Sequence, residues 1–409
     1  MYDVYEIRKQ FPMLQGKKMQ GHDLIYLDNA STTFKPQCVI DATLKYYCDE
    51  TSNHHRGDYD LLSNMDRKVE ESRAAVAHFL GADAREVVFT AGDTMALNLV
   101  ARAYGLKFLK KGDEILLSEA EHASDLLPWY EISHITGAVI KFIPLDEKGV
   151  LTADNLKKII TDRTRVISVA QVSNVLGNVV DVKEFAKIAH QHGAVLVVDG
   201  AQSAPHMKID FHDLDADFLT ISGHKMCGPT GIGCLVGKYN LLQSMDAFYV
   251  GGGMNVTFNK NIEMIPFDAP SKFEAGTQNI AGILGLKAAV EFLESIGLDE
   301  IHKHDRELCE YAISKLEKCD DIIIYNKDAK NGIITFNRKG VFAQDEATLL
   351  NSKGIAIRSG QHCAKILTDF LGCVATCRMS TYLYTTKEEI DVFLDAVING
   401  GDILDAYFN

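Results

Sequence analysis

The stretch RVISVAQVSNVLGNVVDVKEFAKIAHQHGAVLVVD, residues 165–199, decides the fold. Residues 165–171 and 194–199 are continuous apolar runs, which is typical of strands buried on both faces. Between these runs, apolar side chains recur at helical spacing, at Val182, Phe185, Ile188 and Ala189. Gly193 is placed to end that helix. This strand, helix and strand predict two parallel strands joined by a right-handed crossover.

The same pattern extends over most of the chain. Further short strands are expected at residues 86–90, 114–118, 141–145, 217–222 and 231–237. An amphipathic helix is expected from about Asn64 to Leu80. After Leu293 the pattern changes to a helix over 299–318, a strand at 332–336 and a last helix after Thr386. We therefore predict an α/β protein, with a large domain over residues 25–293 and a smaller α+β domain formed by residues 1–24 and 294–409.

The composition excludes several classes of partner. The 409 residues carry 42 Lys and Arg against 56 Asp and Glu, which gives a net charge of -14. No basic cluster interrupts this balance, so we expect neither nucleic acid nor membrane as a partner. No apolar run approaches the roughly 20 residues of a spanning helix, and the first ten residues lack a secretory apolar core. We therefore expect a cytoplasmic protein.

The nine cysteines are expected to be reduced thiols, since their number is odd and they are scattered. Cys363, Cys373 and Cys377 lie close together in the sequence but lack the C-x2-C spacing of a zinc knuckle. We therefore predict no metal site.

The stretch SGHKMCGPTGIG, residues 222–233, places a lysine on a glycine-rich turn. A phosphate-binding loop of the G-x-x-x-x-G-K-[ST] type is excluded, because Ile232 stands where its first glycine belongs and Tyr239 follows the lysine. A dinucleotide fingerprint is excluded as well, because its third small residue would be Val236.

An aldehyde cofactor fits the same turn better. Such a cofactor needs a nucleophilic lysine and a carboxylate facing its pyridine nitrogen, and Lys225 and Asp199 both follow predicted parallel strands. Hydroxyl and imidazole groups for its phosphate lie at neighbouring strand ends, at Thr94, Ser222 and His224. On the residues alone, a solvated Lys225 and an Asp199 that merely begins a turn remain alternatives.

A series of motifs along the chain resembles one family. They are YLDNAST (26–32), HRG (55–57), EHASDLLPW (121–129), QVSNVLG (171–177), FEAGTQN (273–279), RSGQHCA (358–364) and CRMS (377–380). With residues 198–233, they resemble class V aminotransferase-like enzymes, and specifically the Suf-type, group II cysteine desulfurases and selenocysteine lyases. The resemblance implies pyridoxal 5'-phosphate as cofactor, the aspartate aminotransferase-like fold type I, and a homodimer.

The resemblance also implies a role for each site residue. Lys225 would form the Schiff base, Asp199 would face the pyridine nitrogen, and Gln202 would bind the ring hydroxyl. His122 would stack on the ring, and Asn174 would lie beside cofactor and substrate. The phosphate would be held by Thr94, Ser222 and His224, together with Thr277 of the other subunit.

Cys363 lies in a polar loop with His362 beside it and Arg358 five residues before it. Cationic neighbours lower the pKa of a thiol and favour the nucleophilic thiolate, although most cysteines in such loops are inert. The resemblance implies that Cys363 attacks the sulfur of the substrate, releases alanine and carries a persulfide. Arg378 would bind the substrate carboxylate, with Arg358 as the second choice.

This chain departs from the family pattern at five positions. Asp93 and Met95 stand in the phosphate motif, where Asp93 replaces a hydroxyl. Tyr59, Ala123 and Gln361 each replace a histidine. These departures leave the turnover rate, the substrate preference and the sulfur acceptor open.

The sequence therefore predicts a cysteine desulfurase that uses L-cysteine and passes sulfur to an acceptor protein of iron–sulfur cluster assembly. Two enzymes on the same scaffold remain alternatives, a selenocysteine lyase acting on L-selenocysteine and a small-amino-acid aminotransferase. A non-catalytic scaffold for sulfur transfer is the third alternative. It has no use for Lys225, Asp199, His122, Cys363 and Arg378 together.

Overall fold

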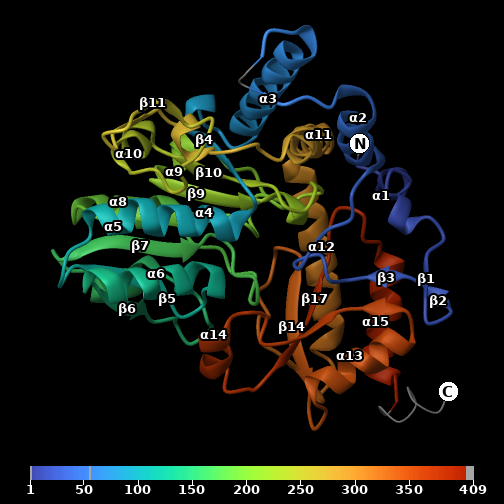
Figure 1. Ribbon diagram of the computed structural model, residues 1–409. Helices are drawn as coiled ribbons and strands as arrows, with labels where there is room; N and C mark the ends of the chain where they lie inside the picture. The colour runs from blue at the N-terminus through green and yellow to red at the C-terminus, as the bar shows by residue number, and fades with distance from the viewer. Residues whose placement is uncertain (1, 55–56, 402–409) are drawn as a thin grey trace.

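A computed structural model describes residues 2–54 and 57–401 (Figure 1). His55 and Arg56 of the HRG motif lie outside the described residues. The centre is a seven-stranded sheet in the order β4-β10-β9-β8-β7-β5-β6. Its strands are β4 (Val87–Thr90), β5 (Glu114–Ser118), β6 (Val139–Ile143), β7 (Thr164–Ala170), β8 (Val195–Asp199), β9 (Phe218–Ser222) and β10 (Gly233–Gly237). Strand β10 is antiparallel to both β4 and β9, and the other four strand pairs are parallel, so the predicted α/β fold with a mostly parallel sheet is confirmed.

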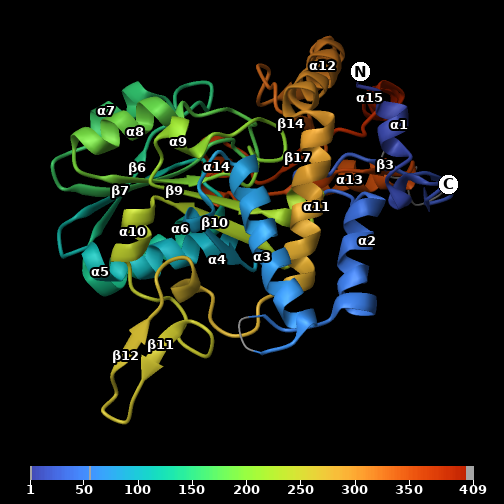
Figure 2. The ribbon, with the colours of Figure 1, turned by 90° about the horizontal axis from the view of Figure 1, so that it is seen from above.

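Helices cover both faces of this sheet, as Figure 2 shows for α7 and α8 on one side and α4 and α6 on the other. The first face carries α3 (Asp60–Phe79), α7 (Ala153–Ile159), α8 (Val182–Gln191) and α11 (Ile280–Ile296). The second carries α4 (Asp93–Val100) and α6 (Ala123–Thr136). Strands β8 and β9 are buried along their whole length, because side chains on both of their faces meet a helical layer.

Helix α3 begins four residues before the predicted start at Asn64. Leu62 is buried together with Met65 and Val69, so the apolar stripe of the helix reaches one turn further toward the N-terminus. The helix ends near Gly81, whose φ of +63° suits glycine.

A second, antiparallel sheet has the order β13-β14-β17-β16. Its strands are β13 (Ile322–Ile324), β14 (Ile333–Arg338), β16 (Arg358–Gly360) and β17 (Thr376–Ser380). It shares an apolar core with α12 (Leu298–Leu316), α13 (Ala343–Ser352) and α15 (Lys387–Asn399). The short strand β3 (Ile25–Tyr26) lies beside this sheet and pairs in parallel with β15 (Ile355–Ala356), so the YLDNAST segment begins next to the smaller sheet.

Shorter elements connect these layers. They are β1 (Lys18–Met19), β2 (His22–Asp23), α1 (Val4–Arg8), α2 (Gln37–Lys45), α5 (Leu106–Phe108), α9 (Phe211–Leu214), α10 (Tyr239–Ser244) and α14 (Lys365–Phe370). A hairpin of β11 (Asn255–Phe258) and β12 (Met264–Pro266) extends away from the body of the molecule (Figure 2). Within residues 2–54 and 57–401, no helix has the length and apolar character needed to cross a membrane.

Candidate active site

One cavity of about 770 Å³ lies where strands β7, β8 and β9 end. Its lining includes the predicted residues Thr94, His122, Asn174, Asp199, Gln202, Ser222, His224, Lys225, Arg358, Cys363 and Arg378. Thr277 is exposed and does not line this cavity. Ligands of parallel α/β sheets bind beyond the carboxyl ends of the strands, and the structure gathers all other predicted site residues there.

Lys225 and Asp199 follow two adjacent strands of the parallel sheet. Asp199 is the last residue of β8, and Lys225 ends the short turn that follows β9. Asp199 is buried, and its Oδ1 accepts a hydrogen bond of 2.8 Å from the backbone N–H of Ala201. Burial lowers the pKa of Lys225, and the carboxyls of Asp199 and Asp93 oppose this shift. A lysine whose pKa is lowered offers more of the uncharged amine that attacks an aldehyde.

The turn that carries Lys225 is fastened through the backbone carbonyl of His224. This oxygen accepts hydrogen bonds from the backbone N–H of Thr33 at 3.0 Å, from the hydroxyl of Thr32 at 3.0 Å and from Nζ of Lys35 at 3.1 Å. Burial lowers the pKa of Lys35 to about 8. The sequence did not single out these donors, which lie 189 to 192 residues earlier in the chain.

His122 is the N-cap of α6, where its Nδ1 accepts a hydrogen bond of 3.1 Å from the backbone N–H of Ser124. Burial, followed by the charge of Lys225, lowers the pKa of His122, so its imidazole is neutral at pH 7. Gln202 donates from Nε2 to the carbonyl of Ala30 at 2.7 Å. Its Oε1 is buried and receives no hydrogen bond from the described residues. The lining of the cavity therefore includes a neutral imidazole and a buried amide oxygen that lacks a donor among the described residues.

The end of the cavity near α4 is suited to an anion. Thr94 lies in the first turn of α4, and its Oγ1 is 2.8 Å from the hydroxyl oxygen of Ser124. Ser222 lies against the glycine that precedes the helix, since a Cβ on Gly92 would be 3.4 Å from the Ser222 hydroxyl. Burial lowers the pKa of His224 to about 4. Helix N–H groups, hydroxyls and a neutral imidazole together form a phosphate-binding set.

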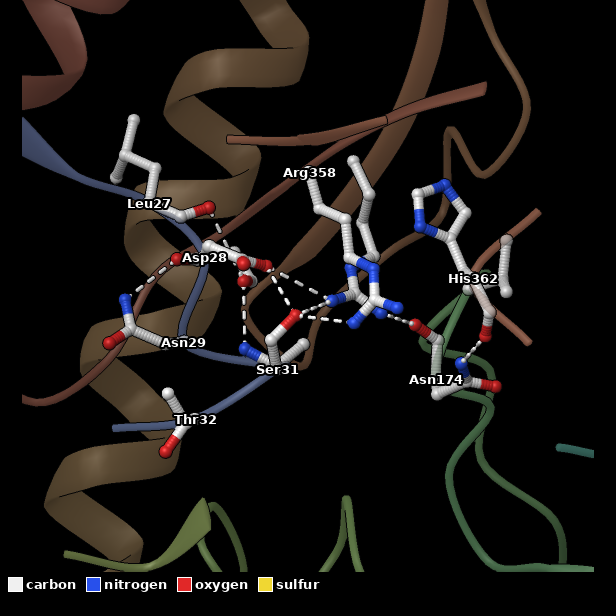
Figure 3. Close-up of polar contacts among 12 residues, drawn as sticks. Leu27, Asp28, Asn29, Ser31, Thr32, Asn174, Arg358 and His362 are labelled. Atoms are coloured by element: carbon white, nitrogen blue, oxygen red, sulfur yellow. Dashed lines mark hydrogen bonds and ion pairs between the residues drawn. The ribbon is translucent and has the colours of Figure 1, made fainter. Parts of the chain in front are cut away.

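Two arginines meet at the other end of the cavity. Arg358 donates to the hydroxyl of Ser31 at 2.9 Å (Figure 3). Arg378 donates to the same hydroxyl, also at 2.9 Å. Arg378 also contacts Asp28 at 3.2 Å and donates to the carbonyl of Asn174 at 2.8 Å. Its Nε is buried and has no partner among the described residues. Burial lowers the pKa of Arg378 to about 10, so it remains charged and offers a carboxylate a planar fork.

Cys363 is exposed at the edge of the cavity, on a loop with unusual backbone geometry. His362 and Cys363 have φ of +52° and +58°, in the left-handed region that favours glycine. The loop is held by hydrogen bonds of 2.8 Å from Asn174 to the carbonyl of His362 (Figure 3) and from Ala123 to the carbonyl of Cys363. Such strain persists only where the surroundings fix it, and it is common at functional sites.

The charge beside this thiol differs from the expectation. Arg358 Nη2 lies 4.0 Å from Cys363 Sγ and is the cationic neighbour. His362 is neutral instead, because burial lowers its pKa to about 3 and its Nε2 faces Thr376 at 2.9 Å. Sequence proximity predicted two cations here, and the structure provides one.

A second cavity, of about 710 Å³, meets the first at Cys363 and was not predicted. Much of its lining is apolar, with Leu126, Leu127, Tyr130, Ile366 and Val374. Its residues come from α6 and from the chain around α14, which are far apart in sequence. Cys363 therefore lines both cavities, together with Arg358 and His362.

A group of buried carboxyls near Asp199 was not predicted from the sequence. Asp93, Glu121 and Asp125 are all buried, and Asp125 Oδ1 accepts a hydrogen bond of 2.5 Å from Ser168. Burial raises the pKa of Asp125 to about 7, and the charge of Asp199 adds to this shift. Among the described residues, one group of potential metal ligands lies close together, at Asp83, Glu86 and His212. It contains none of the cysteines considered from the sequence.

The model of the aminotransferase class-V family matches residues 25–393. The chain belongs to this family. It is 45% identical over 390 residues to a probable cysteine desulfurase of Halalkalibacterium halodurans, covering 95% of this chain and 96% of that protein. It is 43% identical to a cysteine desulfurase of Haloferax volcanii, covering 97% and 96%.

Solved structures agree with these sequence relatives. The cysteine desulfurase CsdA of Escherichia coli is 36% identical, with a TM-score of 0.91 and 99% of both chains covered. The cysteine desulfurase of Thermococcus onnurineus is 35% identical, with a TM-score of 0.92 and 98% and 99% covered. The predicted membership in the class V family and the predicted fold type I are confirmed.

Proposed function

We propose that the protein is a pyridoxal-phosphate-dependent cysteine desulfurase that converts L-cysteine to L-alanine and a persulfide on Cys363. The observation that carries this proposal is the single cavity that holds Lys225, Asp199, a pair of arginines and an exposed thiol. The cysteine desulfurases to which the chain is 43% and 45% identical support it.

The residues present fit pyridoxal 5'-phosphate. When bound, this cofactor supplies an electron sink for bonds at the substrate α-carbon. Lys225 would hold its aldehyde, and Asp199 would face its pyridine nitrogen. The free Oε1 of Gln202 would accept from the ring hydroxyl, and His122 would cover the ring. The phosphate would lie at the start of α4, bound by Thr94, Ser222 and His224.

The substrate would lie between this cofactor site and the arginine end. Its carboxylate would bind Arg378, and the contact of that arginine with Asp28 keeps the fork in place until substrate arrives. Asn174 would lie beside both the substrate and the Cys363 loop, to which it is bonded. Arg358 donates to Ser31 and lies 4.0 Å from the Cys363 sulfur, so it would be beside the sulfur–sulfur bond as it forms.

Sulfur transfer needs no other reactant. The carbon–sulfur bond of L-cysteine breaks, and a sulfur–sulfur bond forms to Sγ of Cys363. The β-carbon gains a proton, and the product is released as alanine. The substrate sulfur stays on Cys363 as a persulfide. One cysteine and one enzyme thiol thus give one alanine and one persulfide, with no external oxidant or reductant.

The persulfide would then pass to an acceptor protein, which we propose belongs to iron–sulfur cluster assembly. Support comes from the second cavity, which shares Cys363 with the first and has the exposed side chains Leu127 and Val374 at its wall. An acceptor thiol could enter there while the first cavity still holds the cofactor. All nine cysteines are free, which suits the reducing cytoplasm in which we propose that the protein works.

We also propose a homodimer. Apolar side chains on and beside the β11–β12 hairpin are exposed in the single chain, at Val256, Phe258, Ile262, Met264, Ile265 and Phe267. An exposed apolar group of this kind is typical of an interaction surface. Thr277 follows the hairpin in sequence and is exposed, so it is available to the cofactor phosphate of a partner subunit. Full activity in a stable monomer would contradict this proposal.

The proposed function is tested by measuring alanine and sulfide from L-cysteine, with and without a reducing thiol. Cys363→Ala should nearly abolish alanine formation, whereas Cys373→Ala, a partly buried thiol of the same region, should retain it. A Cys363→Ala protein that still desulfurates cysteine at the normal rate would contradict the assignment of the nucleophile.

Two further substrates separate the alternatives. A selenol leaves more readily than a thiol, so Cys363→Ala should keep much of its activity on L-selenocysteine. A wild-type protein that releases selenium but not sulfur would be a selenocysteine lyase. A requirement for a keto-acid acceptor would indicate an aminotransferase instead.

A further inference from the structure

Asp93 is a buried carboxyl in the wall of the cavity, and the proposed reaction gives it no role. It is the first residue of α4, directly before Thr94. Its Oδ1 is 2.5 Å from the hydroxyl oxygen of Thr220 on β9. The same hydroxyl oxygen lies 3.5 Å from the carbonyl oxygen of Val198. The Thr220 hydroxyl donates to Oδ1 of Asp93, which leaves Oδ2 as the oxygen that carries the proton when Asp93 is a carboxylic acid.

The charged groups around Asp93 also favour the acid. Asp199 of β8 and Asp125 of α6 are carboxyls, Lys225 follows β9, and the thiol of Cys234 on β10 is buried and neutral. Burial, followed by the charge of Asp199, raises the pKa of Asp93 well above its usual range, while Thr220 and Lys225 oppose the shift. One lysine therefore faces several carboxyls, and the Asp93 side chain itself is buried.

A phosphate group at the start of α4 would add about two negative charges beside Asp93. An ionised Asp93 would repel these charges, whereas the carboxylic acid would not. We propose that Asp93 is a proton-linked positioning residue for the cofactor phosphate, which keeps its proton while the phosphate is bound. This inference rests on the proposed function, because it requires pyridoxal phosphate as the ligand.

The consequence is a pH dependence of cofactor affinity. Below the pKa of Asp93 in the cofactor-free protein, the carboxyl is already protonated and the phosphate binds without change. Above that pKa, binding must take up a proton, so the dissociation constant rises by up to about tenfold for each pH unit. The affinity for pyridoxal phosphate therefore falls as the pH rises, until the pH exceeds the pKa of Asp93 in the bound state.

The test titrates the cofactor-free full chain with pyridoxal phosphate from mildly acidic to mildly alkaline pH. Asp93→Asn keeps a side chain that can contact Thr220 but cannot ionise. It should bind the cofactor about tenfold more tightly than wild type at the alkaline end, and equally tightly at the acidic end. Asp328→Asn is the control, because it removes an exposed carboxylate that does not line the cavity. It should show the wild-type slope.

Binding of pyridoxal, which lacks the phosphate, distinguishes an effect of Asp93 on the phosphate from an effect on the ring. Its affinity should change with pH equally in wild type and Asp93→Asn. If the dissociation constant of pyridoxal phosphate changes with pH equally in wild type and Asp93→Asn, the proposal is overturned. An increase in affinity by one constant factor at every pH would also overturn it, since Asp93 would then be ionised throughout.

If Asp93→Asn does not fold, a calorimetric measurement on wild type alone still tests the proposal. In alkaline buffers of different ionisation enthalpy, pyridoxal phosphate should take up more protons on binding than pyridoxal. Equal uptake would contradict the proposal. A wild type that binds neither compound at any pH would instead overturn the proposed function itself, and this inference with it.

Discussion

The two ends of the proposed sulfur path are built in opposite ways. Lys225 is partly buried on a turn between strands, and the carbonyl before it accepts hydrogen bonds from three residues, Thr32, Thr33 and Lys35. Cys363 is exposed on a loop with left-handed backbone geometry, between two cavities. A cofactor needs a fixed position with little water, whereas a sulfur carrier must reach both a substrate and an acceptor. The contrast teaches that binding and delivery place different demands on the same cavity.

The largest effect on activity is expected from replacing Lys225. Lys225→Ala should lower alanine formation by about a thousandfold or more, because the nucleophile that holds the cofactor is lost. Borohydride reduction of wild type should fix the cofactor on the Lys225 peptide, as peptide mass spectrometry would show. Lys238→Ala serves as the control, since Lys238 pairs with Asp215 outside the cavity. Fixation on another lysine would refute the assignment.

A smaller effect is expected at the arginine end. Arg378→Lys should lower kcat/KM for L-cysteine by about ten- to a hundredfold, mainly through KM, because an ammonium cannot form the bidentate contact. Arg358→Lys should affect KM less and the formation of the persulfide more, since Arg358 lies beside the thiol. Steady-state kinetics measure the first, and single-turnover persulfide formation measures the second. If Arg358→Lys changes KM more and Arg378→Lys changes persulfide formation more, Arg358 binds the substrate carboxylate and Arg378 assists the thiol.

The smallest effect concerns stability rather than chemistry. Since the pKa of Asp125 is raised to about 7 in the folded chain, its contribution to stability is present at acidic pH and is lost as pH rises through about 7. Asp125→Asn should therefore raise the free energy of unfolding by about 2 kcal/mol at alkaline pH, and by much less near pH 4.

Denaturant unfolding at the two pH values measures this difference. Asp328→Asn, which changes an exposed carboxylate, is the control and should have no such pH dependence. An Asp125→Asn effect that is equal at both pH values would show that Asp125 does not titrate in this range.

The site residues that follow β7, β8 and β9 could be predicted, because the ends of these strands could be read from the sequence. Continuous apolar runs fixed β7, β8 and β9, and parallel pairing then brought Asn174, Asp199 and Lys225 to one edge of the sheet. The contacts that depend on distant segments were not predictable. Ser31 meets Arg378 across 347 residues, and no pattern in either segment encodes this contact.

The neutral state of His362 and the burial of Asp93 were missed for a related reason. Residue type and spacing predict that a histidine lies beside Cys363, but not that Thr376 faces it and that burial lowers its pKa. Asp93 could be recognised as an acid in a phosphate motif. Its contact with Thr220, 127 residues later, appears only in the folded chain.

The central claim is that sulfur leaves the substrate at Cys363. It is tested most directly by giving wild type one equivalent of L-cysteine without an acceptor and analysing its peptides by mass spectrometry. We expect one additional sulfur on the Cys363 peptide, equal in amount to the alanine formed and removable by a reducing thiol. Alanine formed in the same amount with an unmodified Cys363 peptide, or with the sulfur on Cys373 or Cys377, would contradict it.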